Sequence, residues 1–548
     1  MGEIRERRLR GHPLIGGIAL LTLVAGCGGG GGDHVGPGPG PPSFSSVPQV
    51  GVSQTVRYDS CSAVGQTGTL YSGTALEPSL VVNPTNTSNL IAEWQENRWS
   101  TGGSQALELG ASSDGGMTWT LTNAAFSVCT GGSAGNAGNY QRASNGWLTV
   151  SPSGVVYALS LSFSGGALLA GSSSGQLVAR STDGGFIWGP PVALIADGAD
   201  FFDDKGSITA DPTNDNYVYA AWDRLTDANS GSSYFAVTAD GGTTWQPATS
   251  IYNPGPSGQT IGNIVVVLPG NIVLDIFSAL STAAASSATA TLFALRSTDN
   301  GSTWVGPVMI GSEESVGTKD PLSGAGIRDS TDLPAVSVSP GGTVYVAWQD
   351  SSFSGGDHDG IAMSSSADGG QTWSAPVEVN GDPSAAAFTP NIHVRADGVI
   401  GVSYYDLRND TVPGSILTDF WMVTSSDGSH FTETHISGPF NLLQAPQGEF
   451  GPGNTLGYFL GDYQALTSNG SAFLPMNTQT NPGTAVSSAV FIDFPGTTAA
   501  AAQGTSGAAR RAFKAVTAPP GQTLSAAARQ RVAARIRRLE AERLQRGR

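Results

Sequence analysis

The chain has 548 residues, of which only 13% are charged and 75 are Gly. Hydrophobic residues make up 39%, which is enough for a core and excludes a chain that is disordered throughout. The net charge of −17 argues against nucleic acid as a partner, because phosphates are bound by a basic surface. Short strands joined by Gly-rich turns fit this composition better than long helices do.

Residues 1–26 have the pattern of an export signal. Four Arg lie within the first ten residues, and the apolar stretch from Leu14 to Ala25 that follows is too short to span a bilayer. The segment Val24-Ala25-Gly26-Cys27 resembles the lipobox of bacterial lipoproteins. The resemblance implies cleavage before Cys27, a lipid on its sulfur, and an exported protein anchored to a membrane of the cell envelope. The alternative is an ordinary secretory signal in which Cys27 occurs by chance.

Residues 27–48 are rich in Gly and Pro, which predicts an extended tether without a core of its own. Cys61 and Cys129 are the other two cysteines of the chain. In an oxidising compartment an even pair is most simply one disulfide. The six His form no cluster in the sequence, and Cys/His spacing typical of a metal site is absent. We therefore expect no cofactor.

One octapeptide, close to Ser-x-Asp-Gly-Gly-x-Thr-Trp, recurs along the body of the chain. Five copies end in Trp, and a sixth is one residue shorter and ends in Phe431. An Asp in a tight turn accepts hydrogen bonds from backbone N–H groups, Gly permits a positive φ, and the Trp can pack between neighbouring sheets. We interpret all six copies as structural turns. Their Asp residues are Asp114, Asp183, Asp240, Asp299, Asp368 and Asp427.

These copies resemble the Asp box of sialidase-like, BNR-repeat β-propellers. The resemblance implies an all-β propeller over residues 49–497, made of four-stranded antiparallel blades, with each box between the third and fourth strands. Apolar residues alternate around the boxes as expected for four short strands per repeat. The box spacing favours seven blades, with six as the alternative. The segment from Val50 to Arg57 is the candidate strand that closes the ring.

Ligands of propellers usually meet the face formed by loops after the second strands and loops that enter the first strands. Basic residues are scarce in the acidic body of this chain, yet five Arg fall in those loops. Because a planar guanidinium pairs with carboxylates bidentately, we predict an anionic or polyhydroxyl glycan as ligand. The alternative is that each Arg pairs with a neighbouring Asp and links adjacent blades. The five are Arg98, Arg142, Arg224, Arg328 and Arg408.

Sialidases use three Arg on the substrate carboxylate, a Tyr nucleophile activated by a Glu, and an Asp acid/base. The resemblance implies an exo-acting hydrolase of anionic, sialic-acid-like glycans. Its candidate catalytic residues are Arg98, Arg224, Arg408, Tyr463 (or Tyr140), and Asp204 or Asp350, with Arg142 and Arg328 as further ligand-binding residues. The chain departs from the family because the first blade has no Arg-Ile-Pro motif and no Glu can be paired with a Tyr by motif. The resemblance is therefore specific for the fold and not for the catalytic set.

Two other functions stay open. A non-catalytic surface propeller would bind glycans or protein partners with the same face, and Trp94, Trp222 and Trp348 would then be stacking platforms for sugar rings or ordinary strand-end packing. A hydrolase or lyase acting on a different uronate-containing polymer is the other. A calcium site is conceivable in the loop from Asp350 to Asp359, although its spacing matches no EF-hand.

The C-terminal part of the chain differs from the body in its charge. Residues 498–524 have the composition of a linker, and residues 525–548 predict a basic helix with Val532, Ile536 and Leu539 on one side. Ten Arg and one Lys lie within residues 507–548. Such a helix either lies on anionic lipid or envelope polymer or is a solvated tail. We expect the whole protein to be a monomer.

Overall fold

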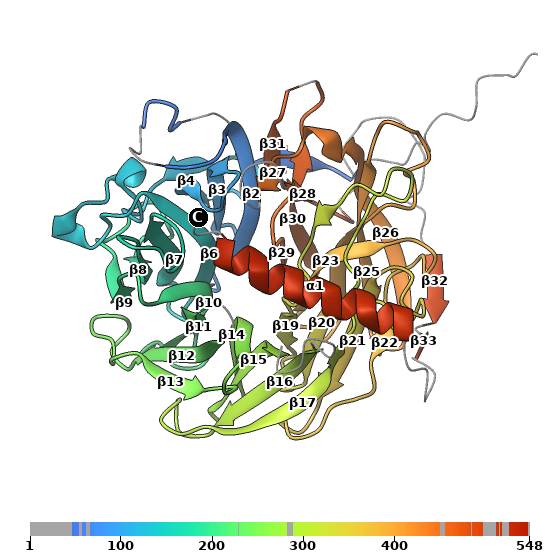
Figure 1. Cartoon of the computed structure of the whole chain (residues 1–548). Coiled ribbons are helices and arrows are strands. Elements are labelled where there is room, and N and C mark those ends of the chain that lie inside the picture. Colours follow the sequence, from blue (N-terminus) through green and yellow to red (C-terminus); the bar gives the residue numbers. More distant parts are fainter. Residues whose placement is uncertain are drawn as a thin grey trace, which may run out of the picture. The chain divides into compact units, whose positions relative to one another are not determined.

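The computed structural model describes residues 47–53, 57–61, 66–227, 230–281, 289–449, 455–483, 485–496, 511–514, 516–517 and 525–545. Over these residues the protein is all-β, with many short strands, three 3-10 turns and one α-helix (Figure 1). The predicted export signal and Cys27 lie outside the described residues. No helix in the described part is long and apolar enough to cross a membrane.

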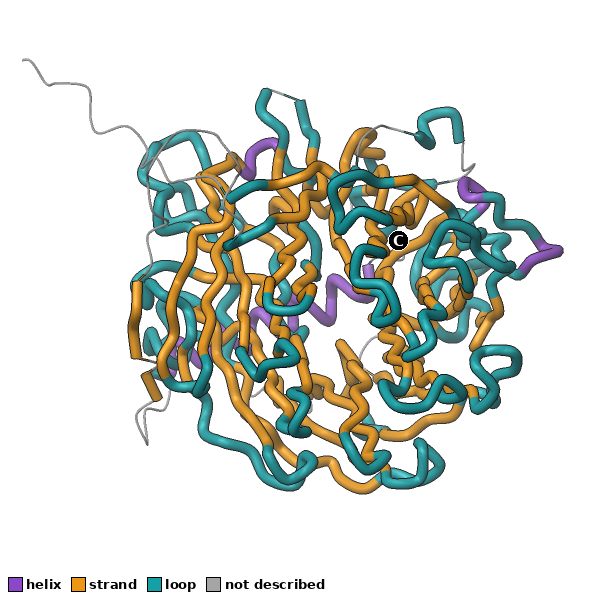
Figure 2. Tube along the Cα trace, turned by 180° about the vertical axis from the view of Figure 1, so that it is seen from behind, coloured by secondary structure: helices purple, strands orange, loops and turns teal. Residues whose placement is uncertain are grey.

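Six antiparallel meanders of four strands follow one another along the described part of the chain, joined by the loops seen in Figure 2. Their strands, in chain order, are β2 (Leu70–Val82), β3 (Leu90–Trp99), β4 (Ser104–Ser112) and β5 (Thr120–Thr122); β6 (Arg142–Val150), β7 (Val156–Ser164), β8 (Ser173–Ser181) and β9 (Val192–Asp197); β10 (Phe202–Ala210), β11 (Val218–Asp227), β12 (Ser230–Thr238) and β13 (Thr249–Tyr252); β14 (Gly258–Leu268), β15 (Ile272–Ser281), β16 (Thr289–Ser297) and β17 (Val305–Glu313); β19 (Ala335–Val338), β20 (Val344–Asp350), β21 (Gly360–Ser366) and β22 (Val377–Glu378); and β23 (Ala387–Val394), β24 (Ile400–Asp406), β25 (Leu417–Ser425) and β26 (His430–Asn441).

A further antiparallel sheet follows the sixth meander. It consists of β29 (Ala465–Asn469), β30 (Ala472–Thr480) and β31 (Ser488–Asp493), and β1 (Gln49–Gly51) pairs with β31 as its fourth strand. The first strands of successive meanders contact one another from β2 through β6, β10, β14 and β19 to β23, and β29 contacts both β23 and β2. Because β1 pairs with β31, strands from the two ends of the body lie in one sheet.

The second strands of the meanders are buried on both faces, because neighbouring meanders cover them on both sides. Trp94 on β3, Trp222 on β11 and Trp348 on β20 are almost completely buried. Each indole N–H donates to a carboxylate, which satisfies the polar atom inside the core. The acceptors are Glu96 (3.1 Å), Asp203 (2.8 Å) and Asp350 (3.0 Å), respectively. These Trp are core residues, which favours the packing alternative over a role as sugar-stacking platforms.

Each Asp box forms the turn between the third and fourth strands of a meander. In the first box Asp114 accepts the backbone N–H groups of Met117 (3.0 Å) and Thr118 (2.9 Å) and the hydroxyl of Thr118 (2.6 Å). Gly115 and Gly116 have φ of 77° and 92°, a region that a side chain disfavours. The side-chain and backbone hydrogen bonds from Thr118 lower the pKa of Asp114 to about 2. The carboxylate is thus the acceptor that organises the turn.

Cys61 and Cys129 form a disulfide with a Cα–Cα distance of 5.6 Å. Cys129 lies in the 3-10 turn η1 (Val128–Thr130), which is followed by a second turn, η2 (Ala134–Asn136). The bond links the segment ahead of β2 to the connection between the first two meanders, as the sequence predicts.

In the C-terminal segment the structure describes two short strands and the helix that the sequence predicts. Within residues 498–524, β32 (Arg511–Lys514) pairs with β26 and β33 (Val516–Thr517) pairs with β22, so both extend outer edges of meanders. The helix α1 (Ala526–Gln545) lies across the β-structure (Figure 1). Its side chains Val532 and Ile536 are buried against that structure. The described apolar residues of α1 therefore contact the body of the protein.

Candidate functional site

The first strands of the meanders share a local irregularity. Residues with positive φ interrupt the pairing within β2, β6, β10, β14 and β23, and others stand just ahead of β19 and β29. A β-bulge of this kind re-aims side chains and is common beside binding sites. Most of these positions carry polar side chains. In chain order they are Glu77, Asn145, Lys205, Gly262, Asp332, Thr389 and Gly461.

Polar contacts made at these positions join different meanders to one another and to the residues before β29. The side chain of Lys205, only 2% exposed, donates to the carboxylate of Asp462. Glu77 accepts the backbone N–H of Asp462 (2.9 Å), and Asn145 donates to Asp204 (2.8 Å). These bonds hold the residues before β29 against β2 and β10.

Asp462 also receives a guanidinium from a separate sheet. This sheet consists of β18 (Ile327–Arg328), β28 (Thr455–Phe459) and β27 (Gln447–Glu449). Arg328 on β18 donates through Nε (3.0 Å) and Nη2 (2.5 Å) to the two oxygens of Asp462. One buried carboxylate is therefore held by two cations, Lys205 and Arg328, in the charge-assisted geometry that makes such pairs strong.

Arg98 approaches the same place from β3. Its guanidinium lies 4.4 Å from the ring centroid of Phe459, and that of Arg328 lies 4.3 Å from the same centroid. Arg98 also donates to Gln95 (2.6 Å), and its side chain is buried. Arg98 and Arg328 line a small recess together with Asn145 and Asp204. Two of the five predicted Arg thus meet through one aromatic ring.

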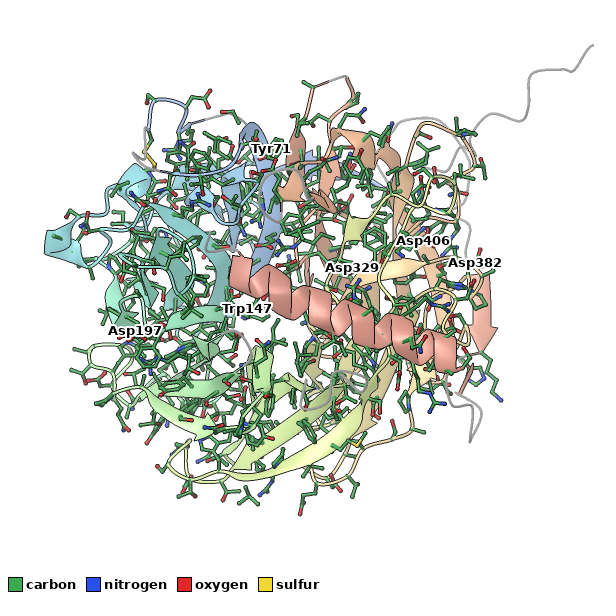
Figure 3. The ribbon with its side chains drawn as sticks, in the orientation of Figure 1. Tyr71, Trp147, Asp197, Asp329, Asp382 and Asp406 are labelled. Atoms are coloured by element: carbon green, nitrogen blue, oxygen red, sulfur yellow. A yellow bond between two sulfur atoms is a disulfide. The ribbon has the colours of Figure 1, made fainter. Side chains whose placement is uncertain are left out.

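A cavity of about 270 Å³ lies beside Lys205, Arg328 and Asp462; we call it the inner-strand cavity. Figure 3 shows Asp329 next to α1, and the helix supplies one wall of the cavity. The charged residues that line it are Lys205, Lys319, Arg328, Asp329, Asp332, Asp462, Arg531 and Arg535.

Tyr463 lies beside this cluster but is poorly suited to act as a nucleophile. Its ring is 4.8 Å from Nζ of Lys205 and packs edge-on against Trp147. Burial, and then the negative charges of Asp462 and Glu77, raise the pKa of the phenol well above its ordinary value. A phenol in this environment keeps its proton. Tyr140, the other candidate, is buried among the core of the first two meanders.

Arg224 and Arg408 do not join Arg98 at the inner-strand cavity. Arg224 donates through Nε and Nη2 to the two oxygens of Asp197 on β9, both at 2.7 Å, and so links the second and third meanders. Arg408 makes the same bidentate pair with Glu433 on β26 (2.8 and 2.7 Å). Neither lines the cavity. The linking interpretation fits Arg224, whereas Arg408 and Glu433 belong to the same meander and brace it internally. The Arg set taken over from sialidases is not assembled.

Arg142 and Asp350 are likewise held by the protein's own groups. Arg142 donates to the hydroxyl of Thr101 (3.0 Å) and to the carbonyl oxygen of Gly102 (2.5 Å). Asp350 accepts from the Trp348 indole and from the backbone N–H of Ser352 (2.7 Å). Neither side chain lines the inner-strand cavity.

The loop proposed for calcium is organised by protein donors. Asp359 accepts the Ser315 hydroxyl (2.6 Å) and the backbone N–H groups of Val316 (2.8 Å) and Gly317 (3.0 Å). A cation would have to displace these donors from the carboxylate. Among the residues that the structure describes, no group of three or more His, Cys, Asp or Glu is arranged to hold a metal ion.

Sequence reasoning missed Lys205, Asp462 and Phe459 as site residues. The signal was present for the first two, because both stand in loops that enter a first strand, beside Asp204 and Tyr463. Because only Arg residues were counted in those loops, neither Lys205 nor its partner Asp462 was selected. Phe459 lies in a short sheet outside the repeat, so no box or blade spacing points to it.

No family model matches the chain, and no curated protein matches its sequence. Among solved structures, it is similar to an α-L-arabinanase of Penicillium chrysogenum complexed with arabinobiose, with a TM-score of 0.41, 16% identity, and coverage of 61% of this chain and 94% of that one. It is also similar to a Hadza microbial sialidase, with a TM-score of 0.40, 16% identity, and coverage of 74% of this chain and 77% of that one. For the sialidase of Trypanosoma rangeli the TM-score is 0.41 and the identity 12%, with coverage of 69% of this chain and 55% of that one. At TM-scores this low, neither the activities nor the ligands of these proteins transfer to this chain.

Proposed function

We propose that the six meanders and the sheet of β29, β30, β31 and β1 are seven blades of one propeller. The cyclic contacts of the first strands support this arrangement, since β29 touches both β23 and β2. The pairing of Gln49 with Asp493 supports a ring closed by the N-terminal strand. A closed ring also removes exposed strand edges between the first and last blades.

The function that we propose is binding of an anionic sugar, one that carries a carboxylate, in the inner-strand cavity. The observation that carries it is the convergence of Lys205 and Arg328 on Asp462 within a cavity of about 270 Å³. In an acidic protein, cations gathered beside a cavity favour an anion, and a guanidinium matches a carboxylate bidentately. Sialic and uronic acids both carry this group.

Hydrolysis of such a sugar is the finer hypothesis, and the site supports it less well than binding. A retaining sialidase-like reaction needs a Tyr whose proton a carboxylate removes, whereas the pKa of Tyr463 is raised. Asp204 accepts hydrogen bonds from Asn145 (2.8 Å) and from the backbone N–H of Lys205 (3.0 Å). Both contacts would have to be rearranged before Asp204 could reach the oxygen of a leaving group.

We also propose that the protein is exported and anchored through Cys27. The support is the sequence: an Arg-rich start, a short apolar stretch and the lipobox-like segment that ends at Cys27. The disulfide between Cys61 and Cys129 fits an oxidising compartment. Metabolic labelling with a fatty acid, compared between the natural chain and Cys27→Ser, tests the anchor.

The binding proposal is tested with two matched Arg variants. Arg328→Gln and Arg224→Gln each remove a guanidinium that holds a carboxylate bidentately. We expect Arg328→Gln to weaken binding of 3′-sialyllactose or trigalacturonate, measured by titration calorimetry, at least about ten-fold, because a charge-assisted bond is lost. Arg224→Gln should leave affinity unchanged and lower the unfolding free energy by about 2 kcal/mol.

Equal loss of affinity in both variants, or loss only in Arg224→Gln, would contradict the proposed site. The two ligands distinguish a sialic acid from a uronic acid. Release of the fluorophore from an aryl α-sialoside, measured on the same samples, decides whether the bound sugar is also hydrolysed.

A further inference from the structure

The helix α1 is docked on the β-structure by a continuous apolar stripe. Four of its residues at helical spacing are buried, whereas Ala527, Arg529 and Gln530 are exposed. The stripe packs against residues of β14, β15 and β16 and against Leu333, with Val316 and Tyr463 at its border. The four buried helix residues are Ala528, Val532, Ala533 and Ile536. This burial fixes which side of α1 faces the inner-strand cavity.

Two Arg of α1 contact the rim of that cavity. Nη2 of Arg535 donates to Oδ1 of Asp329 at 2.5 Å, and the Asp329 side chain is completely buried. Arg531 donates to the carbonyl oxygen of Gly356. A Cβ on Gly317 would lie 1.6 Å from Nη1 of Arg535, so the bare backbone there leaves room for the guanidinium. The site accommodates Arg535 closely.

The charge of the cavity depends on the helix. Without α1, its lining carries three basic side chains (Lys205, Lys319 and Arg328) and three carboxylates (Asp329, Asp332 and Asp462). Arg531 and Arg535 of α1 add two positive charges to this balanced set. Arg535 neutralises Asp329. Lys205 and Arg328 then remain as the two cations that hold Asp462, and Arg531 adds a further positive charge at the rim. The helix thereby makes the cavity basic.

We infer that α1 is part of the ligand site and supplies the positive potential with which the inner-strand cavity attracts a carboxylate. The inference rests on the proposed function and identifies α1 as the segment that makes the cavity prefer an anionic ligand. Arg531 attracts the anion from the rim, whereas Arg535 acts as a positioning residue through Asp329.

A thiol in the cavity measures this potential without any sugar. Val316 lines the cavity, and its replacement by Cys introduces a thiol that can be labelled by an anionic or a cationic methanethiosulfonate reagent. The ratio of the two labelling rates reports the local potential. In the full-length chain that carries Val316→Cys together with Cys27→Ser, so that Cys27 adds no second thiol, we expect Arg531→Glu to lower the anionic-to-cationic ratio by about five-fold. The reason is that two units of charge change near the thiol.

The control is Arg529→Glu in the same Val316→Cys background. Arg529 lies on the same helix and is exposed, but it does not line the cavity, so the same charge change should lower the ratio clearly less than Arg531→Glu does. Equal ratios for Arg531→Glu and the unchanged helix would overturn the inference. Arg535→Gln is the second variant; its expected shift is in the same direction, and circular dichroism checks that it folds.

Sugar binding separates the two proposals. If Arg531→Glu lowers the ratio and weakens 3′-sialyllactose or trigalacturonate several-fold, both stand. A lowered ratio with no sugar bound by any form refutes the proposed ligand and leaves the role of α1 intact. A tighter sugar complex in Arg531→Glu would show that α1 covers the cavity against the ligand, and would overturn the inference.

Discussion

Guanidinium groups of this chain occupy two kinds of environment that look alike in the sequence. Arg224 and Arg328 each stand directly beside an Asp in the sequence, Asp223 and Asp329 respectively. In the structure Arg224 meets Asp197 of the neighbouring meander, and Arg328 meets Asp462 beside a cavity. Spacing alone cannot distinguish them, because the partner of each Arg is remote in the sequence or belongs to another meander. A similar ambiguity affects the Trp residues that end second strands.

Trp348 gives a test at this scale. Trp348→Phe removes the N–H that donates to the buried carboxylate of Asp350, and it leaves a small cavity in the core. We expect the unfolding free energy, measured by denaturant titration, to fall by about 1–3 kcal/mol while sugar affinity stays constant. Trp373→Phe is the control, because no hydrogen-bond partner is found for that indole N–H among the described residues. Lost affinity with unchanged stability would restore Trp348 as a stacking platform.

At the scale of the element, the Asp box is the feature that sequence reasoning explains best. Its Ser, Asp, Gly and Thr positions predict the turn, and Asp240 does accept the N–H (2.9 Å) and hydroxyl (2.6 Å) of Thr244. The irregularities at Asn145, Lys205 and Thr389 could not be predicted, since no single residue type marks a bulge. β32 and β33 were also missed, because edge strands in an Ala- and Gly-rich segment lack periodicity.

The box carboxylates make the fold sensitive to acid. Hydrogen bonds from Thr244 lower the pKa of Asp240 to about 2. A lowered pKa means that the carboxylate stabilises the fold above its unfolded-state pKa, about 3.9, and that this contribution is lost as pH falls through the folded value. We expect Asp240→Asn to be less stable than the natural chain at pH 5, with the difference shrinking between pH 4 and pH 2. Denaturant titration at each pH measures it.

Asp200→Asn is the matched control, since Asp200 is exposed and lies outside the boxes. A constant difference between Asp240→Asn and the natural chain over this pH range would refute the role given to the ionised box carboxylate.

Across the body of the molecule, repeat and charge are the two properties that the sequence conveys. The repeat predicts the meanders and a partner strand near Val50, and β1 is found paired with β31. The charge predicts an acidic body and a basic C-terminal helix, but not where the helix lies. Its docking depends on Ile261, Leu280, Ala290 and Leu333, which are brought together only by the folded strands.

Closure of the proposed ring by β1 is testable at this scale. Val52 is completely buried, and its N–H donates to the carbonyl oxygen of Val490 (2.8 Å). Deletion of residues 47–53 should lower the unfolding free energy by at least about 3 kcal/mol, because an apolar side chain and a row of strand hydrogen bonds are lost. Deletion of seven residues of the predicted tether, 30–36, is the control. Equal stability of the two deletion variants, measured by thermal and denaturant unfolding, would show that β1 does not close the fold.

The most direct test of the central claim is a crystal structure of the protein grown with 3′-sialyllactose or trigalacturonate. We expect the sugar in the inner-strand cavity, with its carboxylate on the side of Lys205 and Arg328 and with Arg531 at the rim. A sugar bound at the Asp-box turns or on any other surface, with the inner-strand cavity empty, would refute the proposed site.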